Sequence, residues 1–170
     1  MLAQIERIAR DIEGISKFSE PGQDAGRRGI YRLSFTPEQM AAVKYVQAQL
    51  AGVGYSMRIT PHGNFRFRRA HDDWSRPAVM AGSHLDAVPG GGRFDGVAGV
   101  VAAVEVARLL AREGLPAPGG TPYEVVIFSE EEGSRFGGVL TGSRAAIGGI
   151  SRSEAAGLRD AQGTSYLEAA

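Results

Sequence analysis

The sequence predicts an α/β fold, and the order of three apolar segments supports this prediction. Residues 77–83 and 123–129 are short apolar runs of the kind that form buried strands. Residues 97–113 lie between them, with a helical apolar pattern and a glycine at 114 that can end the helix. The order strand, helix, strand favours two parallel strands joined by a right-handed crossover.

The N-terminal 18 residues predict an amphipathic helix. Apolar side chains recur there at three- and four-residue spacing, at Leu2, Ile5, Ile8, Ile12 and Ile15. Residues 19–29 are rich in glycine and polar residues, so we expect them to form a loop.

A second helix is predicted to begin at Thr36. The Thr36 side chain can cap the helix, Pro37 suits its first position, and Gln39 completes a capping box. The helix is expected to end near residues 52–54, Gly-Val-Gly, where a glycine can take a left-handed conformation.

Two alternating segments, 55–60 and 64–69, are joined by a Pro-His-Gly turn and predict a β-hairpin. In the second segment the phenylalanines are expected to point inward and the arginines outward. Together with the parallel pair, the hairpin predicts a mixed sheet flanked by helices.

Composition excludes several classes of function. The 170 residues fit one domain, and 19 basic residues balance 19 acidic ones, which does not favour a nucleic-acid or anionic-membrane partner. The absence of cysteine excludes disulfides, thiol nucleophiles and thiolate metal sites. No apolar run approaches the roughly 20 residues of a membrane span, and the N-terminus does not resemble a signal peptide. We therefore expect a cytoplasmic protein.

The loop after the first predicted strand contains three side chains suited to metal binding, namely His84, Asp86 and Asp95. Asp86 is close enough in sequence to fix the tautomer of the His84 imidazole, as carboxylates do beside metal-bound histidines. Asp95 follows a glycine-rich turn that is flexible enough to return to the end of the strand.

Three acidic residues, Glu130, Glu131 and Glu132, follow the second predicted strand. Ligands of open α/β sheets bind beyond the carboxyl ends of the strands, so we expect the two loops to meet at one sheet edge. Neighbouring buried carboxylates repel one another unless a cation or solvent separates them. Nitrogen and oxygen ligands without sulfur suit zinc, manganese or cobalt.

A purely structural interpretation is also open, in which the glutamates are a solvated surface run and His84 is a hydrogen-bonded core histidine. The other two histidines, His62 and His71, fall in a predicted turn and a polar segment, so we expect both on the surface. A serine nucleophile is not indicated, because the G-x-S-x-G pattern is absent.

Residues 82–100 and the block that begins at Glu130, "EEEGSRFGG" followed by "GSRA", resemble the signature blocks of the N-carbamoyl-L-amino acid hydrolases. This group includes β-ureidopropionase and allantoate amidohydrolase, within the dinuclear zinc carboxypeptidase and aminoacylase superfamily. Residues 26–39 and 61–64 are similar to the same group, so the resemblance covers nearly the whole chain. It implies a zinc-peptidase-like fold and hydrolysis of N-carbamoyl-L-amino acids or related ureido compounds to an L-amino acid, carbon dioxide and ammonia.

The resemblance also implies roles for single residues. His84 would bind one divalent ion, Asp95 would bridge two ions (zinc, manganese or cobalt), and Asp86 would take part in catalysis by orienting His84. Counting back from the glycine that follows the acidic run, Glu131 would be a metal ligand and Glu130 the general acid/base. Glu132 would be accessory, although three consecutive glutamates leave this register open by one position.

Members of that family are much longer, which implies that residues 1–170 are the N-terminal part of the catalytic domain. Later histidine ligands, substrate-binding residues and a dimerisation domain would lie outside it, so we expect little or no activity from these residues alone. The implied partners are a small ureido substrate and, through the missing domain, a second subunit. Ala87 stands where the family usually has threonine. Two alternatives are a peptidase or aminoacylase of the same superfamily and a non-catalytic α/β binding module.

Overall fold

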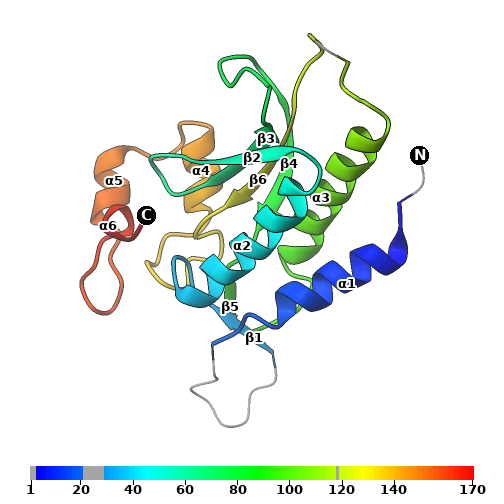
Figure 1. Cartoon of the computed structure of the whole chain (residues 1–170). Helices are drawn as coiled ribbons and strands as arrows, with labels where there is room; N and C mark the ends of the chain where they lie inside the picture. Colours follow the sequence, from blue (N-terminus) through cyan, green and yellow to red (C-terminus); the bar gives the residue numbers. More distant parts are fainter. Residues whose placement is uncertain (1–2, 21–28, 118) are drawn as a thin grey trace.

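The computed structural model describes residues 3–20, 29–117 and 119–170. Its main sheet has four strands in the order β2-β3-β6-β4, and a separate two-stranded sheet pairs β1 with β5 (Figure 1). The strands are β1 (Ile30–Arg32), β2 (Tyr55–Ile59), β3 (Phe65–Arg69), β4 (Val79–His84), β5 (Ala87–Gly91) and β6 (Tyr123–Phe128). The helices are α1 (Ile5–Ser16), α2 (Pro37–Ala51), α3 (Val97–Arg112), α4 (Thr141–Ala146), α5 (Arg152–Gly157) and α6 (Tyr166–Ala169).

The main sheet is mixed, as the sequence predicts. The hairpin β2–β3 and the pair β3–β6 are antiparallel, whereas β4 and β6 are parallel and are joined through α3. In the parallel register His84 lies opposite Phe128, so both strands end at the same level. The predicted α/β fold is therefore confirmed, and the loops after β4 and β6 start side by side.

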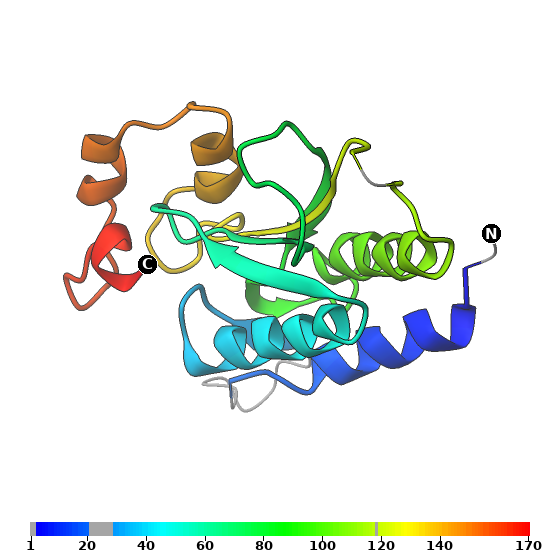
Figure 2. The same cartoon turned by 45° about the horizontal axis from the view of Figure 1, so that its top comes forward.

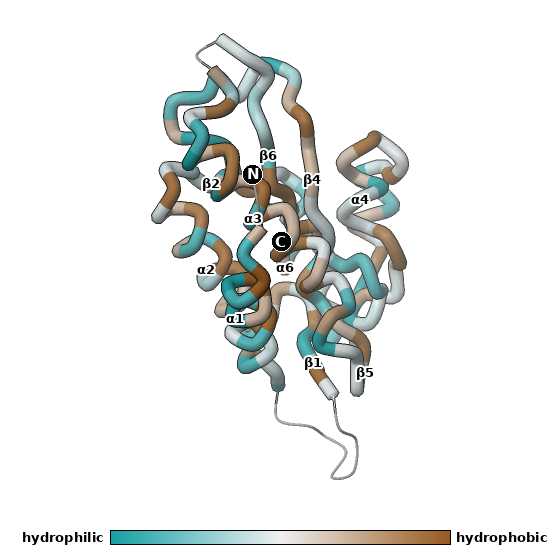
Figure 3. The backbone as a smooth tube through the Cα atoms, turned by 90° about the vertical axis from the view of Figure 1, so that its right-hand side faces the viewer, coloured by the Kyte–Doolittle hydropathy of each residue, from teal (hydrophilic) through white to brown (hydrophobic). Residues whose placement is uncertain are grey.

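Helices cover both faces of the sheet. Figure 2 shows α1, α2 and α3 together on one side, and Figure 3, which views the sheet edge-on, places α4 on the opposite side. The core on the first side includes Phe65, Phe67, Val125 and Ile127, each at most 1% exposed. Burying an apolar side chain fully contributes about 1.5–3 kcal/mol, so this layer holds the strand ends in place.

A second, smaller core lies under α5 and α6. Phe136 and Tyr166 pack there edge to face with ring centroids 5.6 Å apart, and Phe35 stacks on both at an angle. Phe136 follows the acidic loop closely in sequence, so this core anchors the far side of that loop.

The predicted helix boundaries agree closely with the structure. The Thr36 hydroxyl accepts the Gln39 N–H, and the last residue of α2 precedes Gly52. The Gln39 side chain accepts the N–H of Phe35 rather than that of Thr36, so the capping box closes one residue early. Gly114, just beyond α3, has a left-handed φ of 68°.

Other expectations need correction. Ile5 lies at the first turn of α1 and is 80% exposed, while Leu2 and residues 21–28 of the predicted loop lie outside the described residues. Arg68 does not point to solvent: it is 3% exposed and pairs with the buried Glu124 of β6. No helix within the described ranges is long and apolar enough to cross a membrane.

Candidate metal centre

The loop after β4 is more ordered than a glycine-rich sequence suggests. Residues Ala87–Gly91 form β5, which pairs antiparallel with β1 through the register Ile30–Gly91 and Arg32–Ala87. The buried Arg32 side chain donates to the backbone carbonyl of Leu85, which lies between His84 and Asp86 in the sequence. The start of the loop is therefore held both by the backbone pairing of β5 with β1 and by the Arg32 side chain.

The hydrogen bonds of His84 indicate its tautomer. The Nδ1 atom lies 2.9 Å from the backbone carbonyl of Asp86, and a carbonyl can only accept, so Nδ1 carries the proton. This leaves a lone pair on Nε2, which lies 3.8 Å from a carboxylate oxygen of Asp95. The Asp86 atom closest to Nδ1 is thus its backbone oxygen, because its carboxylate is farther away, at 3.6 Å.

Gly96 allows α3 to begin directly against the imidazole. It has a left-handed φ of 63°, and a Cβ built there would come within 2.4 Å of the His84 carbonyl oxygen and 2.6 Å of the ring. Contacts this short exclude any larger residue without movement of His84. The sequence analysis did not single out Gly96, although its position beside Asp95 is a usable signal.

The structure brings His84 and Asp95 together with Glu132. One ligand atom from each of the three lies within 4.8 Å of the others. Burial raises the pKa of the Glu132 carboxyl, and the adjacent Asp95 carboxyl raises it further. Two neighbouring carboxylates and an unprotonated imidazole nitrogen are the oxygen and nitrogen ligands that zinc, manganese and cobalt bind. The residues present therefore fit a divalent cation.

Glu131, the predicted ligand, does not belong to this group. Its two carboxylate oxygens accept hydrogen bonds from the backbone N–H and the hydroxyl of Ser143, at 2.7 and 2.8 Å, in the first turn of α4. Glu131 thus contacts α4, whereas Glu132 lies beside His84 and Asp95. The physical reason is local: Glu130 has a left-handed φ of 55°, which turns the acidic run sharply as it leaves β6.

Glu130, the predicted general acid/base, is 1% exposed. Its Oε1 atom accepts the backbone N–H groups of Arg135 and Phe136, and burial raises the pKa of its carboxyl. The other oxygen has no hydrogen-bond partner among the described residues. Through these contacts the Glu130 side chain joins the start of the acidic loop to its end at Arg135 and Phe136.

Asp86 is also enclosed, at 2% exposure, and burial raises the pKa of its carboxyl. It accepts the backbone N–H of Glu132 at 3.0 Å. Asp86 therefore links the two loops, whereas Glu130, the other predicted catalytic residue, is not one of the three grouped residues.

The remaining histidines lie outside the centre. His71 is 75% exposed, as predicted. His62 is half-buried, and its Nε2 atom is enclosed without a partner in the described part of the chain, which differs from the expected surface position.

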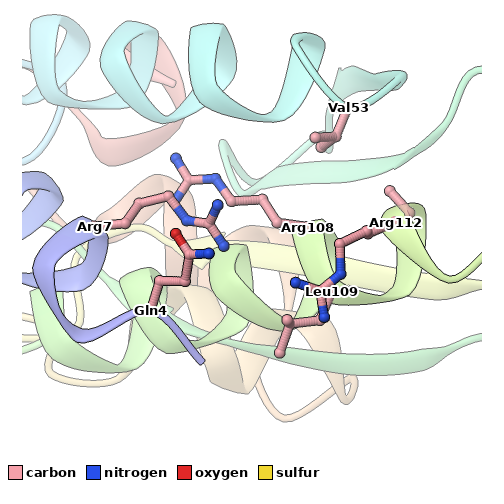
Figure 4. Close-up of a pocket in the computed structure, with 7 residues that line it drawn as sticks. Gln4, Arg7, Val53, Arg108, Leu109 and Arg112 are labelled. Atoms are coloured by element: carbon pink, nitrogen blue, oxygen red, sulfur yellow. The ribbon is translucent and has the colours of Figure 1, made fainter. Parts of the chain in front are cut away.

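A cavity of about 510 Å³ lies elsewhere, between α1 and α3 (Figure 4). Its polar lining includes Arg7 and Arg108, whose guanidinium groups are already paired with Glu105 and Asp11. None of the three clustered residues lines it, so size alone does not identify the site.

The family model "Peptidase family M20/M25/M40" matches residues 80–165, just over half of the chain and the whole region that holds the three-residue group. The chain belongs to peptidase family M20/M25/M40. The resemblance inferred from the sequence is confirmed within this family. An N-carbamoyl-L-amino-acid amidohydrolase of Paenarthrobacter aurescens is 39% identical over 168 residues, which are 99% of this chain and 39% of that protein.

Another named relative and a solved structure are also similar to this chain. An allantoate amidohydrolase of Escherichia coli is 33% identical over 83% of this chain and 34% of its own length. The crystal structure of a hydantoinase/carbamoylase family amidase from Burkholderia ambifaria superposes with a TM-score of 0.85 at 30% identity, covering 98% of this chain and 39% of that one. The chain thus spans about two fifths of the length of the Paenarthrobacter aurescens amidohydrolase and of the Burkholderia ambifaria amidase.

Proposed function

We propose that this chain contributes the divalent-metal site of an amidohydrolase that cleaves the C–N bond of N-carbamoyl-L-amino acids or related ureido compounds. The observation that carries the proposal is the convergence of His84, Asp95 and Glu132 within 4.8 Å, beyond the carboxyl ends of two parallel strands. The named activities of the relatives support the ureido substrate class.

The three side chains would hold the cation as follows. His84 would offer Nε2, because its Nδ1 proton is engaged by a carbonyl. Asp95, whose side chain is 52% exposed, would offer one carboxylate oxygen to this ion and the other to the second ion of the expected pair. A divalent ion bound here would polarise a carbonyl and lower the pKa of water.

Glu131 is the residue we propose for proton transfer. It is adjacent in sequence to Glu132, it is half-buried, and the Ser143 contacts hold its carboxylate in one orientation while leaving lone pairs on both oxygens. A carboxylate held in this way can take a proton from the attacking water and return it to the leaving nitrogen. Glu130 is too enclosed for this role, so the proposal moves both predicted roles by one residue.

A titration with Zn²⁺ and Mn²⁺ by calorimetry tests the site. Glu132→Gln should weaken binding strongly because it removes a ligand charge, whereas the matched variant Glu131→Gln should bind the ion nearly as the unchanged chain does. If Glu131→Gln loses the ion and Glu132→Gln keeps it, the register counted from the glycine is the right one. No binding by the unchanged chain would contradict the metal site altogether.

The substrate class needs a separate assay. Ammonia release from N-carbamoyl-L-amino acids and allantoate should be compared with hydrolysis of N-acetyl amino acids and dipeptides. The assay needs a metal-loaded protein that also carries the C-terminal part implied by the family resemblance, because little or no activity is expected from residues 1–170 alone. Turnover confined to ureido compounds supports the proposal, and turnover confined to dipeptides or N-acetyl amino acids supports a peptidase or aminoacylase instead.

A further inference from the structure

The backbone of the acidic loop is hydrogen-bonded to the segment that begins α4. Three consecutive backbone N–H groups, those of Leu140, Thr141 and Gly142, donate to the carbonyls of Glu131, Glu130 and Ser129, at 2.9, 3.0 and 2.9 Å. This antiparallel arrangement runs along the start of α4 and fixes the backbone that carries the glutamates.

A single carboxamide joins that segment to the main sheet. The Asn64 Oδ1 atom accepts the Ser129 N–H at 3.1 Å, and its Nδ2 atom donates to the Gly142 carbonyl at 2.9 Å. With the Gly142 N–H to Ser129 carbonyl bond, three hydrogen bonds close a ring among these residues. The Asn64 carboxamide therefore accepts one backbone hydrogen bond and donates another, as a peptide group of a neighbouring strand would.

The ring is enclosed and closely packed. Asn64 is 2% exposed and Ser129 is completely buried. A Cβ on Gly142 would lie 2.4 Å from the Asn64 oxygen and 2.5 Å from the Ser129 nitrogen, so only glycine fits there without displacement. The Ser129 hydroxyl adds a bond to the Gly63 carbonyl at 2.8 Å, which ties the same turn of the β2–β3 hairpin to the loop.

We propose that Asn64 is the positioning residue of the metal centre: it sets where the acidic run leaves β6, and so whether Glu132 reaches the ion shared with His84 and Asp95. This inference rests on the proposed metal site. Only a carboxamide supplies one acceptor and one donor in this shape, since a carboxylate of equal size accepts but cannot donate. Residues that orient metal ligands through hydrogen bonds affect metal affinity about 10- to 100-fold when they are replaced.

The test compares Asn64→Asp with Thr60→Val in the full chain, by calorimetric Zn²⁺ titration and by thermal denaturation without metal. The Thr60 hydroxyl accepts the backbone N–H of Asn64 at 3.1 Å in the same hairpin and so tests the hairpin turn without altering the Asn64 carboxamide. We expect Asn64→Asp to bind zinc about 10- to 100-fold more weakly, and Thr60→Val to keep its affinity even if it is less stable. The added negative charge would by itself strengthen cation binding, so a weaker affinity indicates lost geometry.

Three outcomes separate the possibilities. If Asn64→Asp binds zinc as tightly as the unchanged chain while Glu132→Gln does not, Asn64 has no positioning role and the proposed metal site stands. If the unchanged chain does not bind zinc, the metal site itself is wrong. If Asn64→Asp does not fold, hydrogen exchange of the unchanged chain decides: zinc should slow exchange of the Ser129 and Gly142 amides, and protection of Glu132 alone would overturn the inference.

Discussion

The Asp86 carboxylate accepts the backbone N–H of Glu132, with 3.0 Å between the two atoms. This bond connects the loop that follows β4 to the loop that follows β6, next to the three residues proposed to bind a cation. Asp86 therefore acts on both sides of the centre, since its backbone carbonyl also fixes the His84 tautomer.

Replacing Asp86 by alanine should weaken zinc binding about 10- to 100-fold, because the Glu132 backbone loses its fixed position. It should also lower the free energy of unfolding by about 1–3 kcal/mol, since a buried N–H group is left without its acceptor. Calorimetry and urea denaturation measure the two effects. Asp11→Asn is the control: Asp11 is equally enclosed and pairs with Arg108 away from the loops, so this variant should lose stability and keep its zinc affinity.

Gly96→Ala should displace the His84 imidazole and weaken zinc binding, because the new Cβ would lie within 2.6 Å of the ring. Gly114→Ala is a matched control with a similar φ of 68° and no heavy atom within 4 Å of the added Cβ. Both variants place alanine at a positive φ, which strains the backbone. Only Gly96→Ala should change the zinc affinity and the NMR signals of the His84 ring; equal effects of the two variants would contradict the close approach.

The ion pair between Arg7 and Glu105 should make stability depend on pH. Burial acts to raise the pKa of Glu105, but the Arg7 guanidinium, the Gln4 N–H and the charge of Arg108 outweigh it and hold this pKa below its usual range. The contribution is therefore present above the ordinary glutamate pKa, about 4.3, and is lost as the pH falls through the lowered value.

Urea denaturation at about pH 7 and about pH 3.5 tests this pH dependence. Glu105→Gln should be less stable than the unchanged chain at neutral pH and should lose less of its remaining stability on acidification. Glu113→Gln is the control, because Glu113 pairs with Arg112 at an exposed position. An acid-induced loss in Glu105→Gln as large as that of the unchanged chain would show that other groups carry the effect.

Much of the fold could be predicted because the decisive signals are local. The alternation in β2 and β3, the Thr36 cap and the strand, helix, strand order each depend on a few neighbouring residues. The pairing of β5 with β1 could not be predicted, since "AVPGG" has the composition of a loop and becomes a strand only through contact with Ile30 and Arg32.

The two loops that carry the candidate site could be predicted for the same reason. His84 is the single histidine of its loop, and Asp95 is well separated in sequence from the other aspartate there, Asp86, so each could be named without ambiguity. Three consecutive glutamates are indistinguishable in sequence, and their directions depend on the left-handed Glu130 and on acceptors and donors from α4. Distant contacts, which no local pattern records, therefore decide the register.

The parallel pairing of β4 with β6 has a thermodynamic consequence. The imidazole and one carboxylate precede α3, the other carboxylate follows β6, and only the folded sheet holds all three at one point. An ion that binds there and not to the unfolded chain would raise the melting temperature. The free energy of unfolding would increase by about 1.4 kcal/mol for each tenfold increase in the ion concentration above the dissociation constant. The abundance of the folded protein would then follow the supply of the metal.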